Sequence, residues 1–202
     1  MNAIVSRGYR GDNFRMMDEL LPNIVVTVQV EAPEGCVEFG NEEWLEAAVR
    51  HGLVESLPGD THGQISLLLT DDETVRQLNR EYRGVDRTTD VLSFSFEHWG
   101  HWEGDDDAPR SGEDAPPGWP LPADEPPPLG DIIVSVPQAA RQAKDQGVPL
   151  RQELALLIVH GALHLLGHDH YEDAERETMQ ARERDAMAAL FGEEDGQVGG
   201  AK

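Results

Sequence analysis

The segment between residues 149 and 166 restricts the fold most, because it is apolar almost all the way round the helix that its pattern predicts. A helix without a polar face is buried at the centre of a domain rather than laid on its surface. The same segment carries His160 and His164, so this central helix can bring metal ligands into a dry cleft. Its large apolar residues are Leu154, Leu156, Leu157, Ile158, Leu163, Leu165 and Leu166.

Three histidines between positions 160 and 170 have a spacing that suits a single metal ion. Residues four apart lie about 40° apart on one helix face, so His160 and His164 can direct two imidazoles to one ion. Gly167 permits the left-handed conformation that ends a helix and reverses the chain, which can return His170 as a third ligand. Three protein ligands leave a position open for water, as in catalytic zinc sites. His168 is expected either to contact a ligand without touching the ion or to lie at the surface.

The histidine spacing is that of the long zinc-peptidase signature His-Glu-x-x-His-x-x-Gly-x-x-His, with one departure. In that signature the glutamate is the general base that activates water against a peptide carbonyl. Here the position is occupied by Gly161, which has no side chain. A peptidase of this type is therefore not expected unless a carboxylate arrives from elsewhere in the fold. The expected substrate is one for which a metal ion and a cation suffice.

Length and composition favour a single cytoplasmic domain with appendages. A chain of 202 residues can bury a sizeable core. It has no apolar run of about 18 residues or more, so no membrane span is expected. Cys36 is the only cysteine, which excludes an intrachain disulfide. The formal charge of −23 argues against a general nucleic-acid coat, because phosphate contacts need lysine and arginine. Neither a membrane nor DNA is expected as a partner.

An arginine run in the middle of the chain is the exception to this acidity. Arg76, Arg80 and Arg83 recur at intervals of three and four residues, which places them along one helix face. Together with Arg87 they are candidates for a track of phosphate contacts. The alternative for Arg76, Arg80 and Arg87 is an ordinary solvated helix face.

The periodicity along the chain predicts the order β-α-β-α-β-β-α-α-α. This order indicates an α+β domain, in which one small mixed four-stranded sheet carries packed helices. On the second helix, Val75, Leu78 and Tyr82 are expected to face inward. The expected strands are 23–31, 64–70, 90–96 and 130–136, and the expected helices are 41–53, 71–82, 137–146, 149–166 and 171–191. The domain should span 23–191, with a flexible extension at 1–22, an exposed insertion rich in proline and acid at 98–128, and a disordered tail at 192–202.

Three separate motifs stand out along the chain. One is His-Gly-Ala-Leu-His-Leu-Leu-Gly-His-Asp-His at 160–170. The second is Leu-Asn-Arg-Glu-Tyr-Arg-Gly-Val-Asp-Arg-Thr-Thr-Asp-Val-Leu-Ser-Phe-Ser-Phe at 78–96, and the third is Gly-Asp-Ile-Ile-Val-Ser at 130–135. Together these motifs resemble the YbeY family of bacterial endoribonucleases and ribosomal RNA maturation factors. The resemblance covers roughly 23–191. The insertion at 98–128 is longer and more acidic than the family leads us to expect.

The resemblance implies one divalent metal, usually zinc, at His160, His164 and His170, with an essential Arg83 nearby. It implies single-stranded RNA as substrate, with roles in 16S ribosomal RNA 3′-end maturation and ribosome quality control. The small ribosomal subunit and a ribosome-associated GTPase would be partners. An arginine fork binds phosphate in a bidentate way, so we hypothesise that Arg83 clamps the scissile phosphate. Two alternatives remain: a metal-dependent hydrolase of another substrate class, or a non-catalytic ribosome-associated RNA adaptor with a structural metal.

Overall fold

A computed structural model of the chain describes residues 21, 23–33, 41–54, 56–96, 126–168 and 173–192. Most of the expected extension, insertion and tail therefore lies outside the described residues. The elements follow one another in the predicted order. They are β1 (Ile24–Val30), α2 (Glu42–Leu53), β2 (Gly63–Thr70), α3 (Asp72–Arg83), β3 (Val91–Ser95), β4 (Pro128–Ser135), α4 (Val136–Gln146), α5 (Leu150–Leu165) and α6 (Asp173–Phe191).

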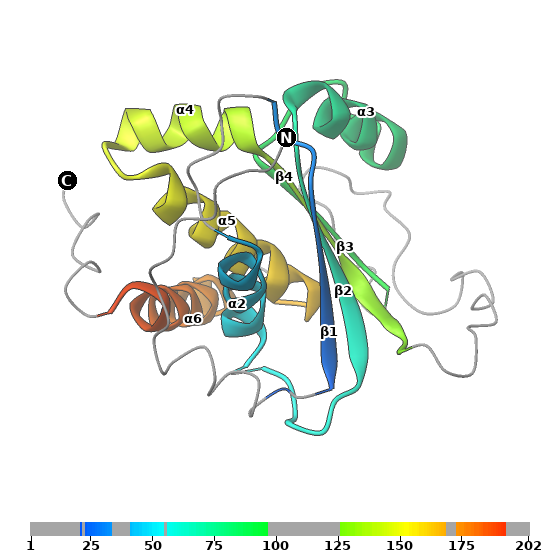
Figure 1. The fold of residues 1–202 in the computed structure, drawn as a ribbon, viewed down its shortest axis with the longest axis vertical. Coiled ribbons are helices and arrows are strands. Elements are labelled where there is room, and N and C mark those ends of the chain that lie inside the picture. The colour runs from blue at the N-terminus through cyan, green and yellow to red at the C-terminus, as the bar shows by residue number, and fades with distance from the viewer. Residues whose placement is uncertain are drawn as a thin grey trace.

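The four strands form one mixed sheet in the order β1-β2-β4-β3 (Figure 1). β1 pairs with β2 and β2 with β4 in parallel, whereas β3 runs antiparallel to β4 at the edge of the sheet. Figure 1 shows α2, α5 and α6 on one side of this sheet and α3 on the other. The predicted α+β class with a small mixed sheet is confirmed.

The central position predicted for α5 is also confirmed, since most of its residues are buried. Two glycines allow its neighbours to approach closely. A Cβ atom added to Gly161 would lie 2.9 Å from the Ile132 side chain of β4, and one added to Gly52 of α2 would lie 2.7 Å from Ala162. These contacts fix the rotation of α5 between the sheet and α2, and therefore the direction of its histidines. No helix in the described residues is both long and apolar enough to cross a bilayer.

The core extends two positions further toward the N-terminus than the sequence suggested. Leu21, placed by sequence in the extension, is 1% exposed and belongs to the main hydrophobic cluster. Its carbonyl accepts a hydrogen bond of 2.8 Å from Arg50 Nη1, and a second guanidinium nitrogen of Arg50 donates to the Ile24 carbonyl. Arg50 of α2 thus ties the start of β1 to the helical layer.

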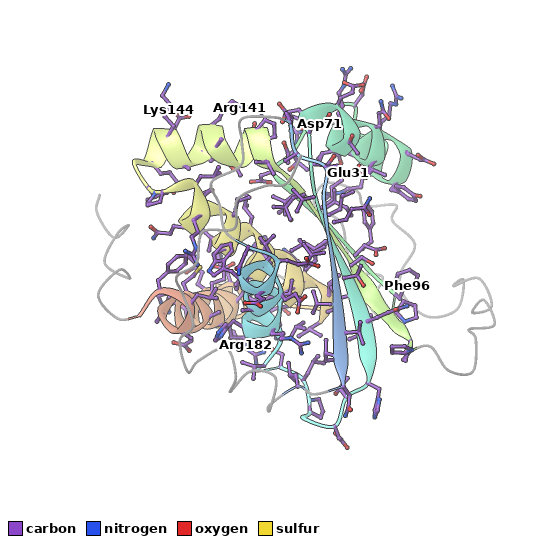
Figure 2. All side chains as sticks on the ribbon, in the orientation of Figure 1. Glu31, Asp71, Phe96, Arg141, Lys144 and Arg182 are labelled. Carbon is purple, nitrogen blue, oxygen red and sulfur yellow. The ribbon has the colours of Figure 1, made fainter. Side chains whose placement is uncertain are left out.

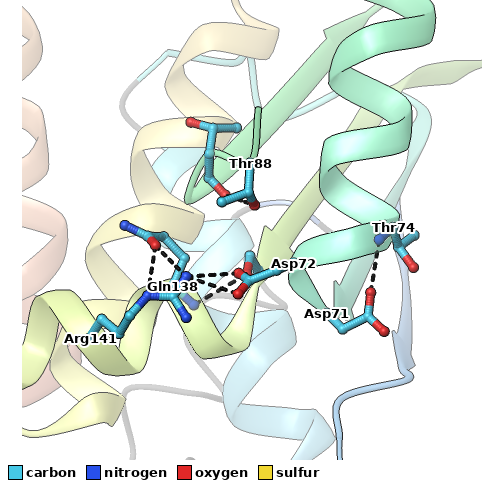
Figure 3. Close-up of polar contacts among 8 residues, drawn as sticks. Asp71, Asp72, Thr74, Thr88, Gln138 and Arg141 are labelled. Atoms are coloured by element: carbon cyan, nitrogen blue, oxygen red, sulfur yellow. Dashed lines mark hydrogen bonds and ion pairs between the residues drawn. The ribbon is translucent and has the colours of Figure 1, made fainter. Parts of the chain in front are cut away.

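Polar contacts at the amino ends of α3 and α4 hold these two helices together (Figure 3). Asp71 caps α3, accepting from the backbone N–H of Thr74 at 2.8 Å. Asp72 forms an ion pair of 2.9 Å with Arg141 of α4, and the Ser135 hydroxyl donates to the same carboxylate at 2.6 Å. The hydrogen bond from Arg141 holds the pKa of Asp72 below its usual value. This network sets the position of α3, the helix that ends at Arg83.

The prediction that Tyr82 faces inward is wrong. Val75 is buried and Leu78 packs against the same small cluster, but Tyr82 is 62% exposed. Its ring lies on that of Phe94, with 5.2 Å between the ring centroids. Because Phe94 belongs to the edge strand β3, the last turn of α3 lies over the border of the sheet. A side chain there packs sideways against one ring instead of entering the core.

Candidate metal centre

His160 and His164 lie one turn apart toward the carboxyl end of α5, and their rings face each other. Their Nε2 atoms are 3.0 Å apart, and the ring planes meet at 81° with 4.5 Å between centroids. Two nitrogens bound to one tetrahedral zinc at its usual bond length would be separated by about 3.3 Å. A small outward movement therefore lets both imidazoles share one ion. The two side chains converge as their spacing suggests, and their role as metal ligands stays a prediction.

The chain turns back directly after this pair. Gly167 has a φ of 77°, in the left-handed region expected for it. Its N–H donates to the His164 carbonyl at 3.0 Å, and the N–H of His168 donates to the Leu163 carbonyl at 3.2 Å. These two bonds are a Schellman motif, which ends a helix and reverses the chain. His170 lies outside the described residues, so its predicted place as third ligand is not seen. The described part alone contains no group of three metal-ligating side chains.

Glu183 of α6 holds the His160 ring from behind. Its Oε1 is 2.7 Å from His160 Nδ1, and its side chain is only 17% exposed. A carboxylate accepts hydrogen bonds, so Nδ1 carries the proton, and in a neutral ring Nε2 then presents its lone pair toward His164. Histidine ligands of metals are commonly oriented by a carboxylate in this way. The residues present therefore fit a divalent ion.

Sequence reasoning missed Glu183, although a signal was available. Met179 and Ala186 of the same helix are 2% and 5% exposed, so they mark its buried stripe. Glu183 follows Met179 by one turn and precedes Ala186 by three residues, which puts a carboxylate on that stripe. A carboxylate on a buried stripe needs a partner. His160 is that partner.

Replacing Glu183 with alanine is expected to weaken metal affinity about 10- to 100-fold, because the imidazole loses the acceptor that fixes its tautomer and orientation. Metal stoichiometry at saturation should not change. The affinity can be measured by competition with a chromophoric chelator. Glu177→Ala is the matched control, since Glu177 is an exposed glutamate on the same helix. Equal affinities for the two variants would contradict the orienting role.

Gly161 does not face the histidine pair. A Cβ atom at this position would lie 2.9 Å from Ile132 Cγ2 and 3.4 Å from Val91 Cγ2, both in the sheet. A glutamate there would have to enter the core, so α5 has no room for the general base of the peptidase signature. Glu183 meets the His160 ring at the nitrogen that faces away from His164, which places it to orient the ring.

Arg83 is the last residue of α3, followed by the left-handed cap Gly84, and its side chain is partly buried. α3 packs on the face of the sheet opposite α5, so Arg83 and the histidines come from different layers. Strand β3 contacts both layers at its end. Its Phe94 packs against Tyr82, and its Ser95 hydroxyl donates to the Leu165 carbonyl at 2.9 Å. A substrate that contacts both Arg83 and the histidines would therefore have to pass the edge of the sheet at β3.

The other candidate arginines differ in their surroundings. Arg76 binds Asp86 with two hydrogen bonds, of 2.8 and 3.2 Å, and lies 3.8 Å from Glu73. The hydrogen bond from Arg76 lowers the pKa of Asp86. The positive charge of Arg76 is thus already paired with Asp86. Arg80 on α3 and Arg87 in the following loop are exposed. Substrate binding by Arg76, Arg80 and Arg87 stays a prediction.

The fold and this site define a small α+β protein with a histidine-based candidate metal centre at the end of its central helix. The sequence matches the family described as Endoribonuclease YbeY over residues 29–191. The chain belongs to the YbeY family.

Curated relatives of this chain carry the name Endoribonuclease YbeY, and three of them serve as examples. The protein from Geobacillus thermodenitrificans is 38% identical over 165 residues, covering 80% of this chain and 96% of its own length. That from Heliobacterium modesticaldum is 47% identical over 120 residues, covering 59% and 65%. That from Moorella thermoacetica is 46% identical over 127 residues, covering 63% and 72%. The predicted resemblance is thereby confirmed.

Proposed function

We propose that this chain is a cytoplasmic, single-strand-specific, metal-dependent endoribonuclease that acts in 16S ribosomal RNA 3′-end maturation and ribosome quality control. One observation carries the proposal: in a chain of the YbeY family, His160 and His164 converge at the end of a buried helix, with Glu183 orienting the first ring. The proposed partners are the single-stranded 16S precursor, the small ribosomal subunit and a ribosome-associated GTPase.

The proposed ion is Zn²⁺, held by His160, His164 and His170. Neutral imidazole suits zinc among the common divalent ions. When bound, the ion would polarise a phosphoryl oxygen, activate water, or both. Glu183 retains the proton on His160 Nδ1, so the ring keeps its Nε2 lone pair available.

Arg83 is proposed to bind the scissile phosphodiester. A guanidinium is always charged and offers paired N–H donors that match two phosphate oxygens. It would neutralise the negative charge that otherwise repels an attacking nucleophile. Arg83 comes from α3 and the histidines from α5, on opposite faces of the sheet. The substrate would therefore lie at the edge of the sheet, at the end of β3.

Removal and restoration of metal test this function against its rivals. After a chelator has removed its metal, the protein should no longer cleave a defined single-stranded RNA. One equivalent of zinc should restore the cleavage. Casein should remain intact under both conditions. Cleavage of casein but not RNA would assign the chain to another class of hydrolase. Restored thermal stability without any RNA cleavage would make it an adaptor with a structural metal.

A further inference from the structure

Arg182, Ser56 and His168 form a polar cluster. Arg182 Nη1 donates to the Ser56 hydroxyl and lies 2.6 Å from His168 Nε2, while the same hydroxyl is 3.0 Å from that ring nitrogen. Arg182 belongs to α6, Ser56 to the segment after α2, and His168 to the turn after α5. Figure 2 shows Arg182 beside α6, near the end of α2.

The partners of Arg182 are uncharged. A serine hydroxyl and an imidazole nitrogen that accepts a hydrogen bond carry no negative charge, whereas the guanidinium is always positive. Arg76 and Arg141, by contrast, form ion pairs with Asp86 and Asp72. Among the residues described in the structure, no carboxylate lies within ion-pair distance of Arg182. Within the described part of the chain, this partly buried cation therefore has no carboxylate partner.

The geometry leaves Arg182 able to bind an anion. Both of its contacts use Nη1. The donors on Nη2 and Nε make no contact within the described residues, and a guanidinium binds a phosphate best through two such donors. Ser56 and His168 hold the side chain in place, which lowers the entropy lost when a ligand binds.

The cluster is also connected in sequence to the candidate metal centre. Arg182 precedes Glu183, whose carboxylate holds His160, and His168 follows His164 across the Schellman turn. In a chain of charge −23, a cation with no carboxylate partner among the described residues is well placed to attract a polyanion.

We propose that Arg182 binds a phosphodiester of single-stranded RNA adjacent to the one that is cleaved, with Ser56 and His168 orienting its guanidinium. This subsite rests on the proposed endoribonuclease function. Arg182 is a substrate-binding residue and takes no part in bond cleavage. It adds a phosphate contact on the α6 side of the metal centre, whereas Arg83 approaches from the side of β3.

The test compares Arg182→Met with Arg184→Met in the zinc-loaded protein. Arg184 is an exposed arginine on the same helix and controls for the loss of one charge. For Arg182→Met we expect KM for a short single-stranded RNA to rise about tenfold while kcat stays within about twofold, because one charge-assisted contact is lost. The negative slope of log(kcat/KM) against log salt should become less steep by about 0.7. Arg182→Lys should keep the wild-type slope at an intermediate KM.

Equal KM values and equal salt slopes for Arg182→Met and Arg184→Met would overturn the subsite. A lower melting temperature or zinc affinity, with KM and slope unchanged, would show instead that Arg182 only fastens α6 to its neighbours. Affinity for the same RNA is also measured by fluorescence anisotropy, in a time short relative to cleavage. If the wild type binds RNA without cutting it, the proposed function fails, and the difference in affinity between the two variants still decides the subsite.

Discussion

Replacing His164 with alanine is expected to abolish stoichiometric zinc binding and to lower RNA cleavage at least about 10³-fold, or about 4 kcal/mol of transition-state stabilisation. His164 Nε2 faces His160 Nε2 at 3.0 Å, so its loss leaves that nitrogen without the partner that would share an ion. The side chain is only partly buried, so alanine should leave no large cavity in the core. Zinc content by mass spectrometry and cleavage of a defined RNA are measured on the same preparation.

His62→Ala is the matched control, because His62 is exposed in the loop before β2. It should keep full zinc content and full activity. A His164→Ala protein that binds zinc and cleaves RNA as the wild type does would remove this histidine from the site. One that keeps its zinc but loses cleavage would reassign His164 from metal ligation to the substrate.

The elements could be predicted because their signals are local. Asn41 and Asp71 each accept a hydrogen bond from the backbone N–H three residues on, which is what a helix cap requires. Gly147 and Gly167 adopt the left-handed conformation that ends α4 and α5. The apolar composition of 149–166 alone indicated a central helix. Each of these inferences depends on a few neighbouring residues and needs no knowledge of the fold.

The order of the strands, and the part of the sheet that each helix covers, could not be predicted from neighbouring residues in the sequence. β4 is inserted between β2 and β3, and this pairing depends on segments far apart in the chain. The error over Tyr82 has the same origin. Helical periodicity correctly grouped Tyr82 with Val75 and Leu78, but it does not show where the sheet beneath the helix ends. Over the edge strand, an inward direction no longer means burial.

The site divides in the same way. His160 and His164 are four residues apart on one helix, so their convergence follows from helix geometry. Glu183 is 23 residues from His160, and the two meet only because α6 packs on α5. Arg182 looks in sequence like one more charge on a solvated helix. Its significance comes from Ser56 and His168, which belong to other segments and offer it no negative charge.

Replacing Arg83 with alanine is expected to lower RNA cleavage about 10²- to 10³-fold, the usual effect of removing one donor that stabilises developing charge. Zinc content should not change, because Arg83 belongs to α3 whereas the candidate ligands His160 and His164 belong to α5. Loss of a basic residue from the last turn of α3 should cost about 0.3–1 kcal/mol of stability. Steady-state kinetics, zinc analysis and a thermal melt separate these three effects.

Arg83→Lys separates the geometry of the side chain from its charge. Lysine keeps the positive charge, and with it the interaction with the carboxyl end of α3, but it cannot offer two parallel donors to one phosphate. Stability should therefore return to the wild-type value, while kcat recovers only in part. Full recovery with lysine would reduce Arg83 to a point charge. If Arg83→Ala cleaves RNA as fast as the wild type, Arg83 does not bind the scissile phosphate. Arg182 would then be the arginine to examine for that contact.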